Sequence, residues 1–576
     1  MIWTIFIGCA TNNTTAFPDD DGVATQTTTV TDTSKHNNPG QTQTPSGLSE
    51  SPDPGMPVFP DVIDTLTISA RTGQGEEDGT DDNTLSVCLS DTDCFTMNLA
   101  EIDDFRVGQT DVYMFNGINI PRSDVDRVEI RSTSGADRWV PSCIEMTFDG
   151  EPVYCEDSLG MWFGEGVDEI ESWTDPKGLH RNCETCFDSP LTHGPLMGGT
   201  EPDTLRLWTR THATTPVAMR LSDTDDINDG VIVDWLYAFP SEDFTGTLEV
   251  SELTPNTQYL YRIEIDGVVV SDTHSVKTAP AIDVPEPFSF SFGSCAKDEE
   301  QPIFGVIESM APDLFFFVGD NHYGNTDQID ALRWFYRFSR SRPQRASLLS
   351  HTPTLAVWDD HDFTGNNTDG TELGKIFALQ GFEEYWANPS YGTQDILGVF
   401  SVYEYGDVDF FLLDDRFYRG FADSVLGAQQ TEWLMTALSE SDATFRFLIS
   451  GSQWTAEGST DSWAAFPQAR SDLFAHLAEL NMGGVVLLSG DIHRSEFRLL
   501  PREGAYDLPE LTSSPLATWT NACPTSDELI GCYGDGISFV RVDVDTTLTD
   551  PELIATLFDV NGVERVSWTI KRSQLQ

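Results

Sequence analysis

Four short polar patches, each directly after an apolar run, carry residue types that bind metal ions. They read Gly-Ser-Cys at 293–295, Gly-Asp-Asn-His-Tyr at 319–323, Trp-Asp-Asp-His-Asp at 358–362 and Gly-Asp-Ile-His at 490–493. Carboxylates, imidazoles and a thiol together suit more than one kind of cation. Paired cations assist phosphate-ester hydrolysis because they lower the pKa of bound water and clamp the phosphoryl oxygens. The patches therefore predict a metal centre for phosphoester chemistry.

The apolar runs before these patches must position them. They occupy 288–292, 314–318, 354–357 and 485–488 and have the continuous apolar character of strands buried on both faces. Such strands favour a parallel or mixed sheet. In open α/β sheets, ligands bind beyond the carboxyl ends of the strands, so the patches are expected to converge although the sequence separates them widely.

Asp320 directly follows one of these runs and is the candidate for a carboxylate shared between metal ions. Cys295 and Tyr323 are unusual beside it, because a thiolate and a phenolate are strong donors and a phenolate is a natural partner of Fe(III). Asp360 and Asp491, together with Asp320, offer the all-oxygen surroundings that Ca²⁺ prefers. Alone, Cys295 would more often be a structural cysteine and Tyr323 a core aromatic, so their combination carries the prediction.

Three other side chains could contact the phosphoryl group or the leaving group. His361 is placed to act as a general acid or as an electrostatic stabiliser. Arg416 and Arg419 follow an apolar strand end and could each donate paired hydrogen bonds to phosphate; Arg416 is also a catalytic candidate. The competing interpretation is a salt bridge from these arginines to Asp414 or Asp415.

The pattern resembles the PhoD-type alkaline phosphatases, a branch of the calcineurin-like metallophosphoesterases. The resemblance runs from about residue 194 to the C-terminus and includes, beyond the four patches, the segments 412–419, 451–454 and 461–470. It implies an iron site with the ligands Cys295, Asp320, Tyr323 and His493. His322 is expected to lie outside the ligand set. The loop after His361 varies from the family pattern, which leaves the role of Asn366 open, and Asn366 is kept as a candidate substrate contact.

The predicted fold is a multi-domain α/β chain in which a four-layer metallophosphoesterase-type α/β/β/α sandwich follows two β-sandwich domains. Short alternating runs over 61–175 are similar to PLAT domains, which bind lipids, proteins or calcium, although a generic spacer domain is an equal alternative. Residues 190–282 read as a fibronectin-like sandwich corresponding to the N-terminal domain of PhoD-type enzymes. Residues 287–576 form the expected catalytic domain, with helices near 328–340, 374–386, 429–439 and 469–480.

The first sixty residues indicate export. Residues 1–9 are apolar, end in Gly-Cys and look like a short lipoprotein signal with Cys9 as the acylation site, while 10–60 have the composition of a disordered linker. A miscalled start of an ordinary secreted protein is the alternative. Eight further cysteines form the local pairs 88/94, 143/155, 183/186 and 523/532, and disulfides suit an oxidising exterior. We expect a secreted or cell-surface bacterial lipoprotein, periplasmic or outer-membrane anchored.

The charge balance limits the partners. Lys plus Arg number 32 against 94 for Asp plus Glu, which gives a formal net charge of −62. Such a surface repels phosphate backbones, so nucleic-acid binding is not expected. The expected function is hydrolysis of phosphate monoesters or diesters through a metal-bound hydroxide. The alternatives are a phosphodiesterase or phospholipase acting on lipids or wall polymers, and a surface binding protein with an inactive scaffold.

Overall fold

The computed structural model describes residues 48, 50–51, 55, 57, 59–72, 84–98, 110–134, 141–156, 172–174, 189–297, 300–420, 424–455 and 459–576. The predicted signal at 1–9, nearly all of the linker at 10–60 and the Cys183/Cys186 pair lie outside these residues. No helix among the described residues is long and apolar enough to cross a membrane.

The described part of 61–175 forms two four-stranded sheets around one apolar core. Their orders are β4-β1-β6-β7 and β3-β2-β5-β8. The strands are β1 (Val62–Thr72), β2 (Thr84–Cys88), β3 (Cys94–Met97), β4 (Thr110–Pro121), β5 (Glu129–Ser134), β6 (Pro141–Phe148), β7 (Glu151–Glu156) and β8 (Ser172–Thr174). A disulfide joins Cys88 to Cys94, and Cys143 and Cys155 are each disulfide-bonded. The alternating pattern of these runs therefore does correspond to a β-sandwich.

A second sandwich follows, with sheets ordered β13-β10-β9 and β12-β11-β14-β15, the last extended by β16 beside β14. Its strands are β9 (Leu191–Met197), β10 (Leu205–Thr211), β11 (Pro216–Ser222), β12 (Val231–Tyr237), β13 (Thr245–Val250), β14 (Gln258–Ile265), β15 (Val268–Val269) and β16 (His274–Lys277). Tyr259 and Tyr261 on β14 both point into buried positions because inward and outward residues alternate along a strand.

The catalytic part is built on two larger sheets. The six-stranded sheet has the order β19-β18-β17-β27-β28-β29 and the seven-stranded sheet the order β20-β21-β22-β23-β25-β24-β26. The first contains β17 (Pro287–Gly293), β18 (Leu314–Val318), β19 (Thr354–Val357), β27 (Ser538–Asp545), β28 (Glu552–Asp559) and β29 (Glu564–Lys571). The second contains β20 (Ser401–Tyr405), β21 (Val408–Leu412), β22 (Phe445–Ile449), β23 (Val485–Ser489), β24 (Ser495–Leu500), β25 (Leu508–Thr512) and β26 (Leu529–Tyr533).

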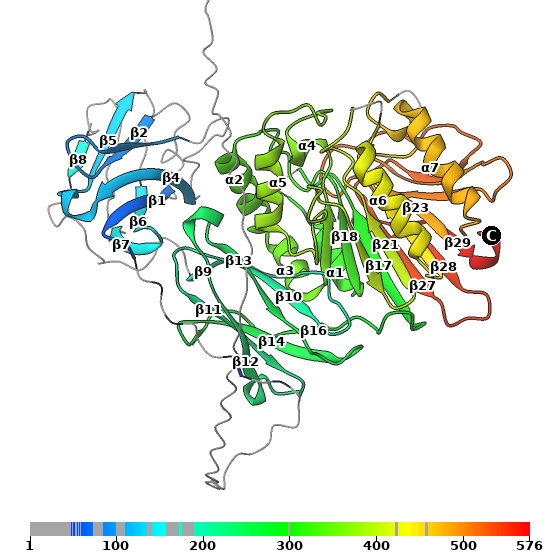
Figure 1. Ribbon diagram of the computed structural model, residues 1–576, viewed down its shortest axis with the longest axis horizontal. Coiled ribbons are helices and arrows are strands. Elements are labelled where there is room, and N and C mark those ends of the chain that lie inside the picture. Colours follow the sequence, from blue (N-terminus) through cyan, green and yellow to red (C-terminus); the bar gives the residue numbers. More distant parts are fainter. Residues whose placement is uncertain are drawn as a thin grey trace, which may run out of the picture. The chain divides into compact units, whose positions relative to one another are not determined.

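Helices cover both outer faces of this pair of sheets (Figure 1). The six-stranded sheet packs on α1 (Ile303–Ser309), α2 (Ile329–Arg340), α3 (Pro343–His351) and α5 (Lys375–Tyr385), and the seven-stranded sheet on α6 (Gly427–Glu440) and α7 (Pro467–Glu479). The short helix α4 (Asp360–Phe363) follows β19. The predicted α/β/β/α sandwich after two β-sandwich domains is confirmed.

The layer between the two sheets is rich in aromatic side chains. Phe290 on β17 contacts Phe410 on β21 and Phe447 on β22, with ring centroids 5.3 Å and 5.0 Å away. All three are fully buried, as is Phe316 on β18. Edge-to-face pairs of this kind add roughly 0.5–1.5 kcal/mol each beyond the apolar area that they bury. The packing holds the two sheets in one relative position, and so fixes the strand ends from which the polar patches extend.

A buried ion-pair cluster joins the second sandwich to helices α2 and α5. Asp243, which precedes β13, accepts hydrogen bonds from Arg210 at 2.9 Å and from Arg337 at 2.5 Å, and Tyr385 also donates to it. Burial alone would raise the pKa of Asp243, but the two guanidinium groups outweigh it and hold that pKa below its usual range. The carboxylate stays ionised and links strand β10 to both helices.

We expect Asp243→Asn to lower the free energy of unfolding by roughly 3–5 kcal/mol, because Arg210 and Arg337 would keep their charges in a buried site without an anion. Denaturant unfolding followed by circular dichroism measures the change. Asp543→Asn is the matched control, since the Asp543 side chain is 49% exposed and its pair with Arg541 contributes little. Equal stability of the two variants would contradict the role of Asp243.

Candidate active site

The four polar patches meet at the carboxyl ends of strands from both large sheets. Cys295 follows β17, and Asp320 and Tyr323 follow β18. Asp360 begins helix α4 directly after β19. Asp491 and His493 follow β23 of the other sheet. The strand order β19-β18-β17 brings the first three patches side by side, and the packing of the two sheets adds the fourth. The predicted convergence is present.

The backbone at these strand ends takes an uncommon conformation. Cys295, Asp320, Asp491 and His493 have φ values of 61°, 53°, 68° and 54°. A left-handed backbone at a residue other than glycine has an energetic cost and persists only where the surrounding structure enforces it. These four residues lie in three turns, after β17, β18 and β23, and all four are predicted metal ligands.

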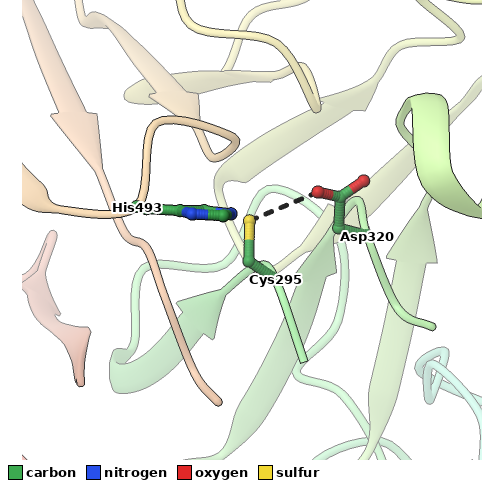
Figure 2. A group of neighbouring side chains, drawn as sticks. All are labelled: Cys295, Asp320 and His493. Carbon is green, nitrogen blue, oxygen red and sulfur yellow. Dashed lines mark hydrogen bonds between the residues drawn. The ribbon is translucent and has the colours of Figure 1, made fainter. Parts of the chain in front are cut away.

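The first group of potential ligands is Cys295, Asp320 and His493, whose ligand atoms all lie within 4.8 Å of one another. Figure 2 shows the three side chains facing one another, with the Cys295 thiol 3.4 Å from Asp320 Oδ2. The Tyr323 hydroxyl lies 3.1 Å from Asp320 Oδ2 and 3.1 Å from His493 Nε2. All four residues implied as the iron site are therefore together.

The second group shares Asp320 with the first. Asp320, Asp360 and His361 offer ligand atoms within 4.8 Å of one another, so Asp320 occupies the position expected of a bridging carboxylate. The backbone N–H of Asn367 donates to Asp360 Oδ2 at 2.6 Å. Asp491, the remaining predicted ligand, lines a cavity together with Asp320 and Asp360.

Burial and mutual repulsion shape the ionisation of this centre. The pKa of Asp320 is raised well above its usual range by burial and then by the charges of Asp360 and Asp359. Burial, followed by Asp360 and Asp461, raises the pKa of Asp491 to about 7. The pKa of the Cys295 thiol is also raised, first by burial and then by Asp320. Nearby cations would reverse each of these effects.

The donor set fits bound cations. Asp360 Oδ1 is buried and finds no hydrogen-bond partner within the described part of the chain. A buried acceptor of this kind has a cost unless another group satisfies it. A thiol, a phenol and an imidazole surround Asp320 in the first group, and the second group adds the Asp360 carboxylate and the His361 imidazole, so both groups offer donors that suit metal ions.

A cavity of about 610 Å³ opens onto these groups. Its lining includes Asp320, Asp360, His361, Asp491 and His493, and also Asn366, so this candidate substrate contact does face the cavity. Asp461 also lines the cavity, although the sequence analysis assigned it no individual role. It lies in the segment 461–470 that resembles the PhoD-type enzymes, but nothing in the local sequence distinguishes Asp461 from the many other acidic residues of the chain.

Arg416 and Arg419 are held by carboxylates instead of lining the cavity. Arg416 is completely buried, donates through Nε to Asp359 Oδ1 at 2.5 Å and pairs with Asp461 at 2.6 Å. Arg419 donates to the Asp461 backbone oxygen at 2.8 Å and to Ser452 Oγ at 2.6 Å. Ion pairing, the competing interpretation, is thus present, but the closest partners are Asp359 and Asp461. Asp415 lies 3.9 Å from each arginine.

The two histidines near the centre differ in their surroundings. His361 stacks on Tyr323 with ring centroids 4.1 Å apart, and its Nδ1 lies 2.5 Å from Asn325 Oδ1. His322 is buried against Phe335 and Tyr336 of α2, and burial lowers its pKa to about 3. His322 therefore stays neutral and belongs to the packing behind the centre, outside both ligand groups.

Two family profiles match this chain. Residues 290–520 match the profile described as PhoD-like phosphatase, and residues 180–280 match that of the PhoD-like phosphatase N-terminal domain. Alkaline phosphatase D of Bacillus subtilis strain 168 is 24% identical over 413 residues, which are 59% of this chain and 69% of that protein. The chain carries PhoD-like phosphatase domains, and this similarity supports a phosphoesterase enzyme over an inactive scaffold.

Solved structures share the fold. One titled "Structure of PhoD" aligns with a TM-score of 0.59 and 20% identity over 68% of this chain and 93% of that one. A purple acid phosphatase from yellow lupin (Lupinus luteus) seeds aligns with a TM-score of 0.52 and 12% identity over 89% of this chain and 93% of that one. Both alignments support the metallophosphoesterase-like fold.

We expect Arg416→Met to destabilise the fold, lowering the free energy of unfolding by roughly 3–5 kcal/mol, because the buried carboxyl groups of Asp359 and Asp461 would lose the guanidinium that pairs with both. Thermal unfolding measures this effect. Lys571→Met is the control, since the Lys571 side chain is 51% exposed and its ion pair with Glu552 contributes little. Unchanged stability together with a raised KM would instead assign Arg416 to the substrate.

Proposed function

We propose that this enzyme hydrolyses phosphate monoesters, diesters or both, with Fe(III) and Ca²⁺ as its cofactors. The observation that supports this proposal is the sharing of buried Asp320 between two ligand groups at the end of one cavity. A carboxylate in that position can bridge two cations. Cys295, Tyr323 and His493 would complete the site for iron, while Asp360 and Asp491 would hold calcium.

When bound, such cations supply an activated water and neutralise charge on the phosphoryl oxygens. The chain's own residues then position the ester. Asn325 Oδ1 can only accept a hydrogen bond, so His361 Nδ1 must donate to it, and the other ring nitrogen remains available. With Nδ1 donating, the other ring nitrogen accepts in the neutral ring and donates only in the imidazolium, so it is the protonated form of His361 that can engage the leaving-group oxygen or a phosphoryl oxygen. Asn366, at the cavity wall, is in reach of the bound ester as a neutral hydrogen-bonding group.

The expected result is hydrolysis of p-nitrophenyl phosphate that is lost on chelation and restored by Fe(III) with Ca²⁺. Asp320→Asn should lower both bound metal and turnover, by at least about a hundredfold in kcat, because one variant removes the shared carboxylate from both sites. Elemental analysis and steady-state assays on the same samples measure the two effects.

Asp543→Asn again serves as the control, since this exposed carboxylate on β27 lies outside the cavity lining. Full activity after complete removal of metal would contradict the proposal. Assays with bis-p-nitrophenyl phosphate in parallel decide the ester class. Faster turnover of the diester would favour the alternative of a phosphodiesterase or phospholipase acting on lipids or wall polymers.

Export and anchoring form a second part of the proposal. The apolar start ending in Cys9 supports a lipid anchor, and the disulfides Cys88–Cys94 and Cys523–Cys532 suit an oxidising exterior. The PLAT-like resemblance of 61–175 would add a lipid or protein contact at the cell surface. We expect the full chain in the membrane fraction of a bacterial host.

Cys9→Ser should move the protein to the soluble exported fraction, and immunoblotting of fractionated cells reads this out. Retention of that variant on membranes would assign the attachment to the PLAT-like domain. Wild-type protein found wholly in the soluble fraction would contradict both forms of attachment.

A further inference from the structure

Charged side chains of both signs line the cavity. Four carboxylates face it, those of Asp320, Asp360, Asp461 and Asp491. Arg494 and Arg498 line it as well, as do the hydroxyl-bearing residues Thr525 and Ser526. Cations held by the carboxylates would attract the phosphoryl group, and the guanidinium groups offer a further place for negative charge. In a chain with 94 acidic residues and only 32 lysines and arginines, two arginines in the lining of one cavity indicate that positive charge has a role there.

A buried carboxylate holds the two arginines in place. Glu496, fully buried on β24, accepts from Arg494 Nε at 2.8 Å and from Arg498 Nε at 2.6 Å. Gln453 donates to the same carboxylate at 2.7 Å. These bonds occupy the Nε donors and fix both guanidinium planes. Fixed donors lose little conformational entropy when a ligand binds.

Arg494 keeps donors for a ligand. Among the hydrogen bonds of the described residues, only its Nε is engaged, so its two terminal nitrogens are available at the cavity wall. Arg498 is more fully used, because its Nη1 lies 3.4 Å from Ser526 Oγ and 3.8 Å from Glu528. Arg494 is therefore the main anion contact, and Arg498 helps to hold Glu496.

The loop 521–526, which also lines the cavity, is anchored as well. The Asn521 backbone donates to the His493 oxygen at 2.7 Å and its side chain to the Ile492 oxygen at 3.0 Å. A disulfide joins Cys523 in this loop to Cys532 on β26. The volume of about 610 Å³ is in the range of cavities that enclose whole small molecules, well beyond a single phosphate. The space beyond the metal centre can receive the alcohol part of an ester.

We infer that Arg494 forms an anion-binding subsite for the leaving group, so that the preferred substrates are phosphate esters whose alcohol carries a second anionic group, a carboxylate or a phosphate. The inference rests on the proposed function for the identity of the reaction. It assigns the specificity to Arg494, just before β24, and to the loop 521–526, neither of which supplies a proposed metal ligand.

Matched substrate pairs test this subsite. Glycerate 3-phosphate differs from glycerol 3-phosphate by a carboxylate in place of a hydroxymethyl group, and fructose 1,6-bisphosphate differs from fructose 6-phosphate by a second phosphate. The metal-loaded full chain should show a kcat/KM about tenfold higher for the substrate with the additional carboxylate or phosphate in at least one pair. The two pairs separate a carboxylate ligand from a phosphate ligand and span different distances.

Arg494→Gln should abolish that preference, while glycerol 3-phosphate and fructose 6-phosphate are turned over as before. Arg494→Lys should retain part of the preference. Arg541→Gln on β27 is the control variant and should change neither the preference nor the turnover of the two esters without an additional anionic group. No preference in the wild-type chain, or the same preference in Arg494→Gln, would overturn the inference. If no ester is turned over, the proposed function fails, and calorimetric Kd ratios for the same pairs still decide the subsite.

Discussion

Mutual repulsion among buried carboxylates dominates the electrostatics of the active-site cavity. Asp320, Asp360, Asp461 and Asp491 line one cavity, and Asp359 lies buried directly behind them. Burial and their neighbours' charges raise the pKa of Asp320 and Asp491. Such a group is stable in its ionised form only with cations nearby. The left-handed backbone at Cys295, Asp320, Asp491 and His493 is the conformational cost of bringing these strand ends together.

Part of the required positive charge comes from the chain itself. Arg416 and Arg419 neutralise Asp359 and Asp461 from behind the cavity, and their buried ion pairs position Asp461 at its wall. The same arrangement recurs where Arg210 and Arg337 surround Asp243. A chain with few basic residues thus places several of them inside, where each fixes an acidic group. Within the described part of the chain, no salt bridge involves the cavity-facing carboxylates Asp320 and Asp360, which leaves them for metal ions.

Strand and helix positions followed well from local pattern. The apolar runs before the four patches are β17, β18, β19 and β23, and the helices expected near 328–340 and 374–386 are α2 and α5. The grouping of Cys295, Asp320, Tyr323 and His493 was also anticipated. The partners of Arg416 were not, because Asp359 and Asp461 are distant in sequence and only the packed sheets bring them to the same guanidinium. For the same reason no local pattern distinguished Asp461.

Local sequence patterns were enough to predict which chemistry is available and where the strands before the four patches end. Apolar periodicity and the ligand types that follow each run are local properties, readable without knowledge of distant contacts. Which charged groups face the cavity, and which are paired with buried arginines, depends on the packing of separate strands. Arg416 and Arg494 are both arginines near a strand end, yet one is enclosed by carboxylates and the other retains free donors. That difference depends on which side chains from separate strands meet, because electrostatic energy depends on distance in space.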